Sequence, residues 1–433
     1  MSLVIEKSQL IRAFSVFILL LISSYYALFF SGYSSARFLQ VVVMLMAYSW
    51  LFLWAGRDWF IFPAKVAILF SLVYGLNFIS LYTSGEDWTG YSLRDLLSFF
   101  AFIPFAYIVY ENFSRRYWLY LALLLGVAAM PWLGGRGWDE VVLGLQGARV
   151  EFGQINAQHA GMLFGVLVLL GSSVIVSVIS YQKKYWLLCF LLLPAVIYFV
   201  FLVSLTQMRA VFLALVVCFF ALLAAFYFRN KKLFFIFFIF VFTVFLISAQ
   251  LGLHERVKER YLAEMVVVEH VARGEFEEVP PNSLGIRLYL WSEGFQYFTQ
   301  RPLLGWGEGG AERLLSQSEI AESRLRGHVH LHNVFLHLLV TLGLLGFLLS
   351  AALMVWLIQK MVRLIRNKGP LESWELIFIS LFFIYFFIVN FFEQYYFYST
   401  GMNIFNLVCS VLVAASMKSK ILDNLNQDQK CTS

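Results

Sequence analysis

Long apolar runs separated by short polar segments follow one another along most of the chain. Windows of about 19 apolar residues, the length that an α-helix needs to cross the hydrocarbon core of a bilayer, mark these runs. They lie near residues 13–30, 38–55, 64–82, 93–110, 117–134, 160–180, 185–205, 209–228, 232–252, 333–358, 376–392 and 397–416. The pattern predicts an all-α integral membrane protein with about twelve transmembrane helices.

One connection, between the ninth and tenth predicted spans, is much longer than the others. It covers residues 253–331, and long ordered connections of this kind usually carry function. Apolar residues at helical spacing predict a helix over 254–270, and Asn282 with Ser283 suits the start of a second one. The predicted parts are spans one to nine in 1–252, the long loop in 253–331, spans ten to twelve in 332–416 and a tail in 417–433.

Basic residues mark one side of the predicted membrane. If the N-terminus, with Lys7 and Arg12, is cytoplasmic, every second connection should be rich in Lys and Arg. The connections that meet this expectation hold Arg57, Lys65, Arg115, Arg116, Lys183, Lys184, Arg229, Lys231, Lys232, Lys360, Arg363, Arg366, Lys368, Lys418 and Lys420. The opposite connections hold far fewer. Both termini are therefore predicted to be cytoplasmic, with the long loop on the outer side.

Composition supports a membrane protein and excludes several other classes. Of 433 residues, 61% are hydrophobic and only 13% are charged, which is too apolar for a water-soluble fold. The net charge of +6 could suggest nucleic acid, but the basic residues lie beside apolar runs, and membrane topology explains that placement better. The cysteines offer no extracytoplasmic pair and no ligand spacing. We therefore expect no nucleic-acid partner, no disulfide framework and no cysteine-bound metal.

Polar residues that interrupt the apolar pattern gather on the predicted outer side. Histidines alternate at His328, His330 and His332, and Asn333 opens the tenth span. Polar groups at the mouth of a span are costly to place and usually belong to a site. The same side also holds Arg149, Asn156, His159, Arg209, Arg287 and Trp291. This common placement predicts a functional site at the outer mouth of the tenth span.

Each of these residues also has an interpretation without function. Arg209 could reach a lipid headgroup, Arg287 could pair with Glu293 on the surface, and Trp291 could anchor the chain at the membrane interface. The three histidines could share one face of an extended segment and bind a metal ion. No carboxylate or cysteine at ligand spacing accompanies them, so we expect no metal there.

Three motifs, taken in order, resemble the O-antigen ligase and polymerase superfamily. LTQMRAVFLAL places Arg209 at the outer start of a central span, and an R-x-x-x-W helix from Arg287 leads into PLLGWGEG. HNVFLHLLVTLGLLG follows, with a His-Asn pair and then a Gly-x-x-Gly. The residues that match this last pattern are His332, Asn333, Gly343 and Gly346. The likeness covers roughly residues 195–400.

The resemblance implies a GT-C-like polytopic glycosyltransferase on the outer face of the inner membrane of a Gram-negative bacterium. The donor would be a glycan linked to undecaprenyl diphosphate, and the acceptor a sugar hydroxyl of the lipid A core. Arg209 and Arg287 would stabilise the departing diphosphate, and His332 would take the proton of the acceptor. Substrate-binding roles would fall to Arg149, His328, His330, Asn333 and Trp291. No metal or other cofactor is implied, and direct displacement would invert the anomeric centre.

Several alternatives stay open from the sequence. His328 or His330 could be the base in place of His332. An O-antigen polymerase would share donor and fold but join two lipid-linked chains, and a protein O-glycosylating transferase is a further relative. A lipid-linked sugar transporter would also have about twelve spans, but should place ionisable residues near the bilayer midplane and often shows repeated halves. The outer placement of the polar residues disfavours transport, and the His-Asn pattern with two outer arginines favours the ligase.

Overall fold

The computed structural model describes residues 2–32, 36–54, 62–83, 93–181, 183–227, 253–320, 323–325 and 327–432. Within these residues all regular secondary structure is helical, as the apolar pattern predicted. The first half contains α1 (Ser2–Phe30), α2 (Ala36–Trp54), α3 (Phe62–Thr83), α4 (Leu93–Phe99), α5 (Phe102–Glu111), η2 (Phe113–Arg115), α6 (Tyr117–Leu133), α7 (Trp138–Leu145), α8 (Ala157–Tyr181), η3 (Lys183–Tyr185), α9 (Trp186–Thr206) and α10 (Arg209–Tyr227). The second half contains α12 (Leu253–Arg273), η4 (Phe276–Glu278), α13 (Ser283–Gln300), α14 (Gly310–Ser316), α15 (Val334–Arg366), α16 (Ser373–Phe392), η5 (Tyr395–Phe397) and α17 (Ser399–Thr432).

Nine helices in the described residues are long and apolar enough to cross a membrane. They are α1, α2, α3, α6, α8, α9, α15, α16 and α17, and each coincides with an apolar run of the sequence. This agrees with the prediction of a polytopic membrane protein. The eighth predicted span corresponds to α10, whose apolar part, Arg209–Ala225, is shorter. The ninth, 232–252, lies outside the described residues, so the count of twelve stays a prediction.

The predicted fourth span, 93–110, is two short helices and not one continuous helix. Pro104 has no N–H to donate to the preceding turn, so the helical hydrogen bonding is interrupted there. Asn406 of α17 satisfies backbone groups on both sides of the break. Its side-chain oxygen accepts the N–H of Phe102 at 3.2 Å, and its NH₂ group donates to the carbonyl of Ser98 at 2.7 Å. The apolar run that predicts the fourth span is therefore folded as two helices joined by a turn, and whether they cross the membrane together stays a prediction.

The C-terminal helix α17 lies at the centre of the bundle. In its apolar window 89% of the residues are buried, whereas only 17% are buried in that of α9, which presents most of its surface outward. α17 packs against α5 and α15, and α8 packs against α9 and α16. A polar side chain of α17 also binds a neighbour, because Asn403 accepts the hydroxyl hydrogen of Tyr25 in α1 at 2.9 Å. The bundle is thus fixed by buried polar bonds as well as by apolar packing.

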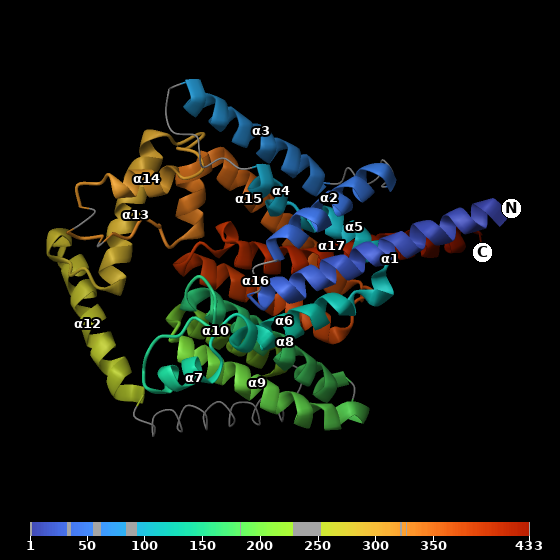
Figure 1. The fold of residues 1–433 in the computed structure, drawn as a ribbon, viewed down its shortest axis with the longest axis horizontal. Helices are drawn as coiled ribbons and strands as arrows, with labels where there is room; N and C mark the ends of the chain where they lie inside the picture. The colour runs from blue at the N-terminus through green and yellow to red at the C-terminus, as the bar shows by residue number, and fades with distance from the viewer. Residues whose placement is uncertain are drawn as a thin grey trace.

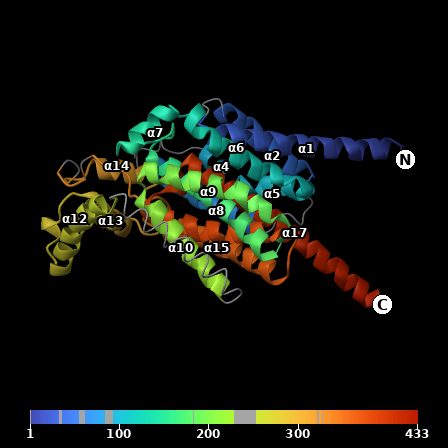
Figure 2. The ribbon, with the colours of Figure 1, turned by 90° about the horizontal axis from the view of Figure 1, so that it is seen from below.

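The helices of the long loop gather at one end of the molecule. Figures 1 and 2 show α12, α13 and α14 at the end opposite to both chain termini. The histidine segment, 328–332, leads into α15 and belongs to this same end, because its Leu331 packs in one apolar cluster with residues of α13 and α14. The sides of the membrane on which the loop and the termini lie stay a prediction.

Helix α15 is broken at Gly343, and the turn at residues 302–307 fills the break. Gly343 has φ +65° and ψ −167°, which no helix contains. The carbonyls of Val340 and Thr341, which lose their helical partners, accept the N–H groups of Trp306 and Gly307 at 2.8 and 2.9 Å. The freed N–H groups of Leu344 and Leu345 donate to the carbonyls of Pro302 and Leu303 at 2.7 and 3.3 Å. Every one of these groups would be very costly to leave unpaired within a membrane.

Glycine is required where the turn meets the broken helix. A Cβ atom on Gly343 would lie 2.3 Å from the carbonyl oxygen of Leu303, and one on Gly305 would lie 2.5 Å from that of Val340. Both glycines also have positive φ, at +65° and +75°. Asn77 of α3 closes the joint, because its NH₂ group donates to the carbonyl of Leu304. The PLLGWG and Gly-x-x-Gly motifs of the sequence are therefore two halves of one joint.

Replacing Gly343 by alanine tests this joint. The change is expected to destabilise the protein by about 1–3 kcal/mol from backbone strain alone, with a further cost from overlap of the new Cβ with the carbonyl of Leu303. Thermal unfolding of the purified protein in detergent measures the loss. Gly75→Ala in α3 is the matched control, because a Cβ there meets nothing within 4 Å. Equal unfolding temperatures for the two variants would contradict this account.

Candidate functional site

His332 and Glu393 form a hydrogen-bonded pair at the outer mouth, meaning the end of α15 where His332 lies. Nδ1 of His332 is 2.8 Å from Oε2 of Glu393, and the two side chains are 18% and 3% exposed. The other carboxylate oxygen accepts the backbone N–H of Gln394 at 3.1 Å. Burial alone would raise the pKa of Glu393, but the bond to His332 and its charge outweigh burial and lower the pKa. The carboxylate is therefore ionised and held in position.

The backbone on either side of His332 is fixed by other residues. Leu331 is fully buried in a small apolar cluster that joins α13, α14 and the start of α15, and its carbonyl accepts the indole N–H of Trp291 at 3.0 Å. Asn333 caps α15 by accepting two N–H groups of the first turn. Between them His332 has φ +49°, a left-handed conformation that is uncommon for residues other than glycine. The bonds of its neighbours hold His332 in this conformation.

These contacts explain two residues that the sequence singled out. Trp291 binds the carbonyl of Leu331 just before His332, and Asn333, just after it, binds the N–H groups of Phe335 and Leu336, so the chain is fixed on both sides of the imidazole. Any direct contact of either residue with a substrate stays a prediction.

A second histidine on the same segment forms its own pair with a carboxylate. Nδ1 of His330 lies 3.3 Å from Oε1 of Glu312 in α14 and 3.3 Å from the side-chain amide of Gln394. The bond to Glu312 raises the pKa of His330, although burial opposes this, and the charges of Glu312 and Glu393 add to it. Burial alone would raise the pKa of Glu312, but the bond to His330 and the nearby imidazoles lower it to about 2. The contact therefore favours the ionised carboxylate of Glu312 and the protonated ring of His330.

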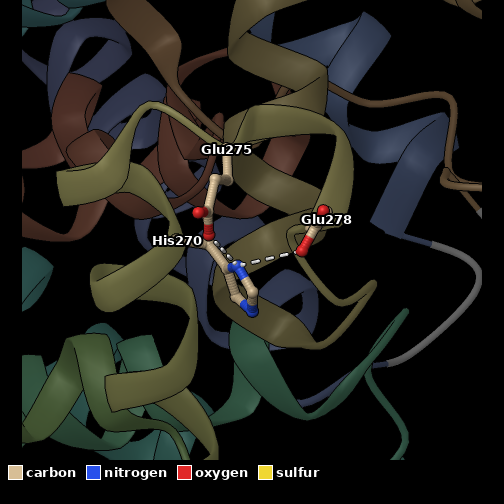
Figure 3. Close-up of side chains that lie close together, drawn as sticks. All are labelled: His270, Glu275 and Glu278. Atoms are coloured by element: carbon tan, nitrogen blue, oxygen red, sulfur yellow. Dashed lines mark hydrogen bonds and ion pairs between the residues drawn. The ribbon is translucent and has the colours of Figure 1, made fainter.

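The three alternate histidines do not share one environment. His328 is exposed, and its ring lies edge-on to that of His332 with 6.0 Å between centroids. His330 contacts a different carboxylate from His332. Within the part of the chain that the structure describes, the one group of three side chains close enough to share a metal ion lies elsewhere. It is His270, Glu275 and Glu278, with Nδ1 of His270 at 3.0 Å and 3.9 Å from the two carboxylates (Figure 3).

One arginine, Arg287, interacts electrostatically with Glu393 of this pair. Arg287 donates to the carbonyl and hydroxyl oxygens of Ser283, while its Nε is buried without a hydrogen-bond partner among the described residues. Burial lowers the pKa of Arg287; the charges of Glu393 and Glu264 oppose this shift, and that of Arg209 adds to it. Arg287 is therefore within electrostatic reach of both Glu393 and Arg209. The surface pair with Glu293 that the sequence allowed is wrong, because Glu293 instead accepts the hydroxyls of Tyr297 and Ser318.

The other two arginines lie at or just before the starts of α10 and α8. Arg209, at the first position of α10, forms an ion pair with Glu264 of α12. Arg149, in the connection before α8, lies 3.3 Å from the sulfur of Met208. That connection is tied to the turn before α10, because the side chain of Gln207 donates to the carbonyl of Gly147 at 2.9 Å. Arg209 interacts electrostatically with Arg287, and Arg149 and Arg287 both interact with Tyr395. That the three arginines form one site stays a prediction.

His159 is a further polar residue of this region, and it is fully buried at the start of α8. Nδ1 of His159 bonds the hydroxyl of Thr400. Its ring meets Tyr395 and Tyr398 edge-on, with centroids 5.3 and 4.8 Å apart. The two tyrosines follow Glu393 in sequence, so His159 helps to fix the segment that carries the carboxylate.

Sequence reasoning missed Glu393, Gln394 and Glu312. The first two form the only polar interruption in FFEQYYF, between two apolar runs on the outer side, and that position was a signal of the same kind as the one that identified His332. Glu312 gave no such signal, because it lies in a loop with several other charged residues. Its importance depends on its contact with His330, which only the fold reveals.

Comparison with known protein families gives a match to the family described as O-antigen ligase, over residues 194–351. The matched segment contains Arg209, Arg287, His332 and Gly343, and Glu393 lies beyond it. The match confirms the predicted resemblance to the O-antigen ligase and polymerase superfamily and supports the view that the chain is one of its members. No curated protein matches the chain by sequence.

The ionic pair predicts the titration of His330. Glu312→Gln removes the charge that raises the pKa of His330, so this pKa should fall, and NMR of ring-labelled histidine measures it. In the native chain the contribution of the pair to folding is full below the unfolded histidine pKa of about 6.5. It is lost as pH rises through the higher folded value. Glu275→Gln, which alters the similar pair at His270, is the control and should leave the His330 titration unchanged. An unchanged His330 pKa in Glu312→Gln would sink the assignment.

Proposed function

We propose that the chain, which carries an O-antigen ligase match, transfers O-antigen from undecaprenyl diphosphate to a sugar hydroxyl of lipid A-core. The reaction takes place at the periplasmic face of the inner membrane of a Gram-negative bacterium, inverts the anomeric centre and is independent of metal. The observation that carries this proposal is the pair of His332 and buried Glu393, which lies within electrostatic reach of Arg287 and beside the helices of the long loop.

The arginines suit the leaving group of this reaction. A diphosphate gains negative charge as the glycosidic bond breaks, and guanidinium groups bind phosphate oxygens in a bidentate manner. Positive groups fixed in a site that excludes bulk water stabilise such charge more strongly than they do in water. Arg287 is suited to this role because its Nε is buried and has no hydrogen-bond partner among the described residues. Arg209 and Arg149 complete the proposed diphosphate site.

His332 suits the role of the general base. With Nδ1 donating to Glu393, Nε2 carries the lone pair that can accept a proton. The acceptor oxygen attacks the anomeric carbon, its proton passes to Nε2, and the bond from the anomeric carbon to the phosphate oxygen breaks. Undecaprenyl diphosphate leaves with the bonding electrons. Proton removal of this kind contributes about 10²–10⁴ in rate.

Glu393 acts as a positioning residue. It holds one tautomer of His332 and stabilises the imidazolium that forms as the proton is taken, the part that a carboxylate plays in other histidine-based sites. Its own position is fixed by the backbone of Gln394. The left-handed backbone at His332 is the conformational cost of this arrangement, and strain of this kind concentrates at functional sites.

Transfer in vitro tests the function. The purified full chain in detergent is mixed with an undecaprenyl diphosphate-linked O-antigen donor and lipid A-core acceptor in EDTA, and gel mobility of the lipopolysaccharide is read. Native protein should give banded product, and His332→Ala should lose it. His270→Ala, which removes a histidine of the surface pair in Figure 3, should retain it.

The other outcomes of this assay discriminate the rival functions. Lengthening of the lipid-linked donor without acceptor would identify a polymerase and overturn the ligase proposal. Absence of any transfer, with or without added divalent metal, would overturn the transferase proposal as a whole and favour transport. Equal activity of His332→Ala and native protein would remove His332 as the base.

The role of Glu393 gives a separate prediction. Glu393→Gln should lower kcat by about 10²–10⁴, the range of general-base help, because an amide no longer fixes the productive tautomer. The KM values of donor and acceptor should stay within about twofold, since neither substrate is proposed to touch Glu393. Glu393→Asp keeps the charge and should recover part of kcat. If Glu393→Gln changes only the unfolding temperature, the residue is structural.

A further inference from the structure

Transfer of one glycan needs the removal of one proton, yet the histidine segment carries two histidine–carboxylate pairs. His332 with Glu393 supplies the proposed base. His330, which pairs with Glu312 of α14, lies two residues before His332 in the same segment. This second pair is not used by that chemistry. Consecutive residues bind the two histidines, because Gln394 contacts His330 and Glu393 contacts His332. The two pairs are therefore neighbours at the outer mouth.

The His330–Glu312 pair is open to solvent. The side chains are 41% and 30% exposed, compared with 18% for His332 and 3% for Glu393. The ring of Tyr398 lies beside His330, with 6.1 Å between centroids. A buried ion pair would serve only to hold the fold, but an accessible carboxylate and imidazole beside an aromatic ring can bind a ligand. The amide of Gln394, which contacts His330, is itself buried.

Different elements at the outer mouth hold the arginines and the second carboxylate. Arg209 begins α10, and Arg287 lies in α13, where it interacts electrostatically with Glu393 and Arg209. Glu312 lies in α14, next to Arg313, and Glu308 lies in the turn before α14. Burial, with the charges of Glu312 and Asp95, raises the pKa of Glu308 to about 7. Glu393 interacts electrostatically with both Arg287 and His330, so the His332–Glu393 pair is a neighbour of both groups.

The two kinds of group suit the two substrates of a glycosyl transfer. A diphosphate offers only hydrogen-bond acceptors, which guanidinium groups match and a carboxylate does not. A sugar acceptor is different, because its hydroxyl groups donate hydrogen bonds and carboxylate and amide oxygens accept them. Glu312 has capacity for such a bond, since its Oε2 has no hydrogen-bond partner among the described residues. That atom is covered here, so a ligand hydroxyl would reach it after rotation of the carboxylate.

We propose that Glu312 and His330, backed by Gln394, form the subsite for the carbohydrate acceptor next to His332. This inference rests on the proposed glycosyl transfer, and it holds for any acceptor whose reacting group is a sugar hydroxyl. Glu312 accepts a hydrogen bond from an acceptor hydroxyl, and a ring N–H of His330 donates one. The acceptor oxygen is thereby placed beside Nε2 of His332.

Steady-state kinetics with the full chain in detergent tests the subsite. The acceptor is lipopolysaccharide without O-antigen, varied at saturating lipid-linked donor, and then the donor is varied at saturating acceptor. Glu312→Gln should raise the acceptor KM by about tenfold or more, the effect of losing one hydrogen bond to a charged group. The donor KM and kcat should stay within about twofold. Glu275→Gln, the matched change in the surface pair, should alter none of these values.

Two outcomes of the kinetics would overturn the subsite while leaving the function standing. A raised donor KM with an unchanged acceptor KM would mean that the donor, and not the acceptor, contacts Glu312. A fall in kcat with both KM values unchanged would place the pair in the chemical step. If the native chain transfers nothing, the proposed function fails, and the subsite is then judged by binding alone.

Binding to the native chain covers the case in which Glu312→Gln does not fold. The NMR signal of the His330 ring, assigned by comparison with His330→Gln, is followed while lipopolysaccharide without O-antigen is added in the absence of donor. The signal should shift and saturate with the acceptor, and stay unmoved with undecaprenyl diphosphate alone. A shift with undecaprenyl diphosphate and none with the acceptor would overturn the proposal.

Discussion

The joint between the turn at 302–307 and the broken helix α15 is the constraint on which the outer mouth depends. A helix broken inside a membrane must have its freed backbone groups paired by protein, since lipid offers no partners. Here the turn supplies donors to one side of Gly343 and acceptors to the other. The same turn connects α13 to α14, so the joint fixes both loop helices against the segment that begins with His332. The carboxylate of Glu312 and the indole of Trp291 are placed by this joint as much as by their own helices.

Much of the fold was readable from the sequence because apolar run length is a local property. The apolar runs predicted the nine described helices that are long and apolar enough to cross a membrane. The motifs predicted the resemblance to the O-antigen ligase family. The break near residues 93–110 was hidden, because its partner Asn406 lies in a distant helix. Arg116 shows a similar limit. The charge rule treats it as a loop residue, whereas it is buried against Glu375 with contacts of 2.6 and 2.8 Å.

For the site, the sequence revealed the residues that stand out against an apolar background and missed the partners that define their chemistry. His332 and the arginines could be recognised because polar groups at a span end are costly. Glu393 could not be assigned to His332, nor Glu312 to His330, because such pairing depends on helix packing across the bundle. Three alternate histidines suggested one shared face, but pairing with separate carboxylates gave His330 and His332 different surroundings.

The ion pair of Arg209 with Glu264 has a consequence for the order of events at the membrane. Glu264 belongs to α12, and its carboxylate forms an ion pair with the guanidinium group of Arg209, which a phosphate oxygen would otherwise contact. A diphosphate arriving at Arg209 is in competition with that carboxylate, because both are anionic oxygen acceptors with the same preferred geometry. Release of Glu264 would remove the ion pair that joins α12 to α10. Under the proposed function, binding of a diphosphate at Arg209 is thus linked to the position of α12.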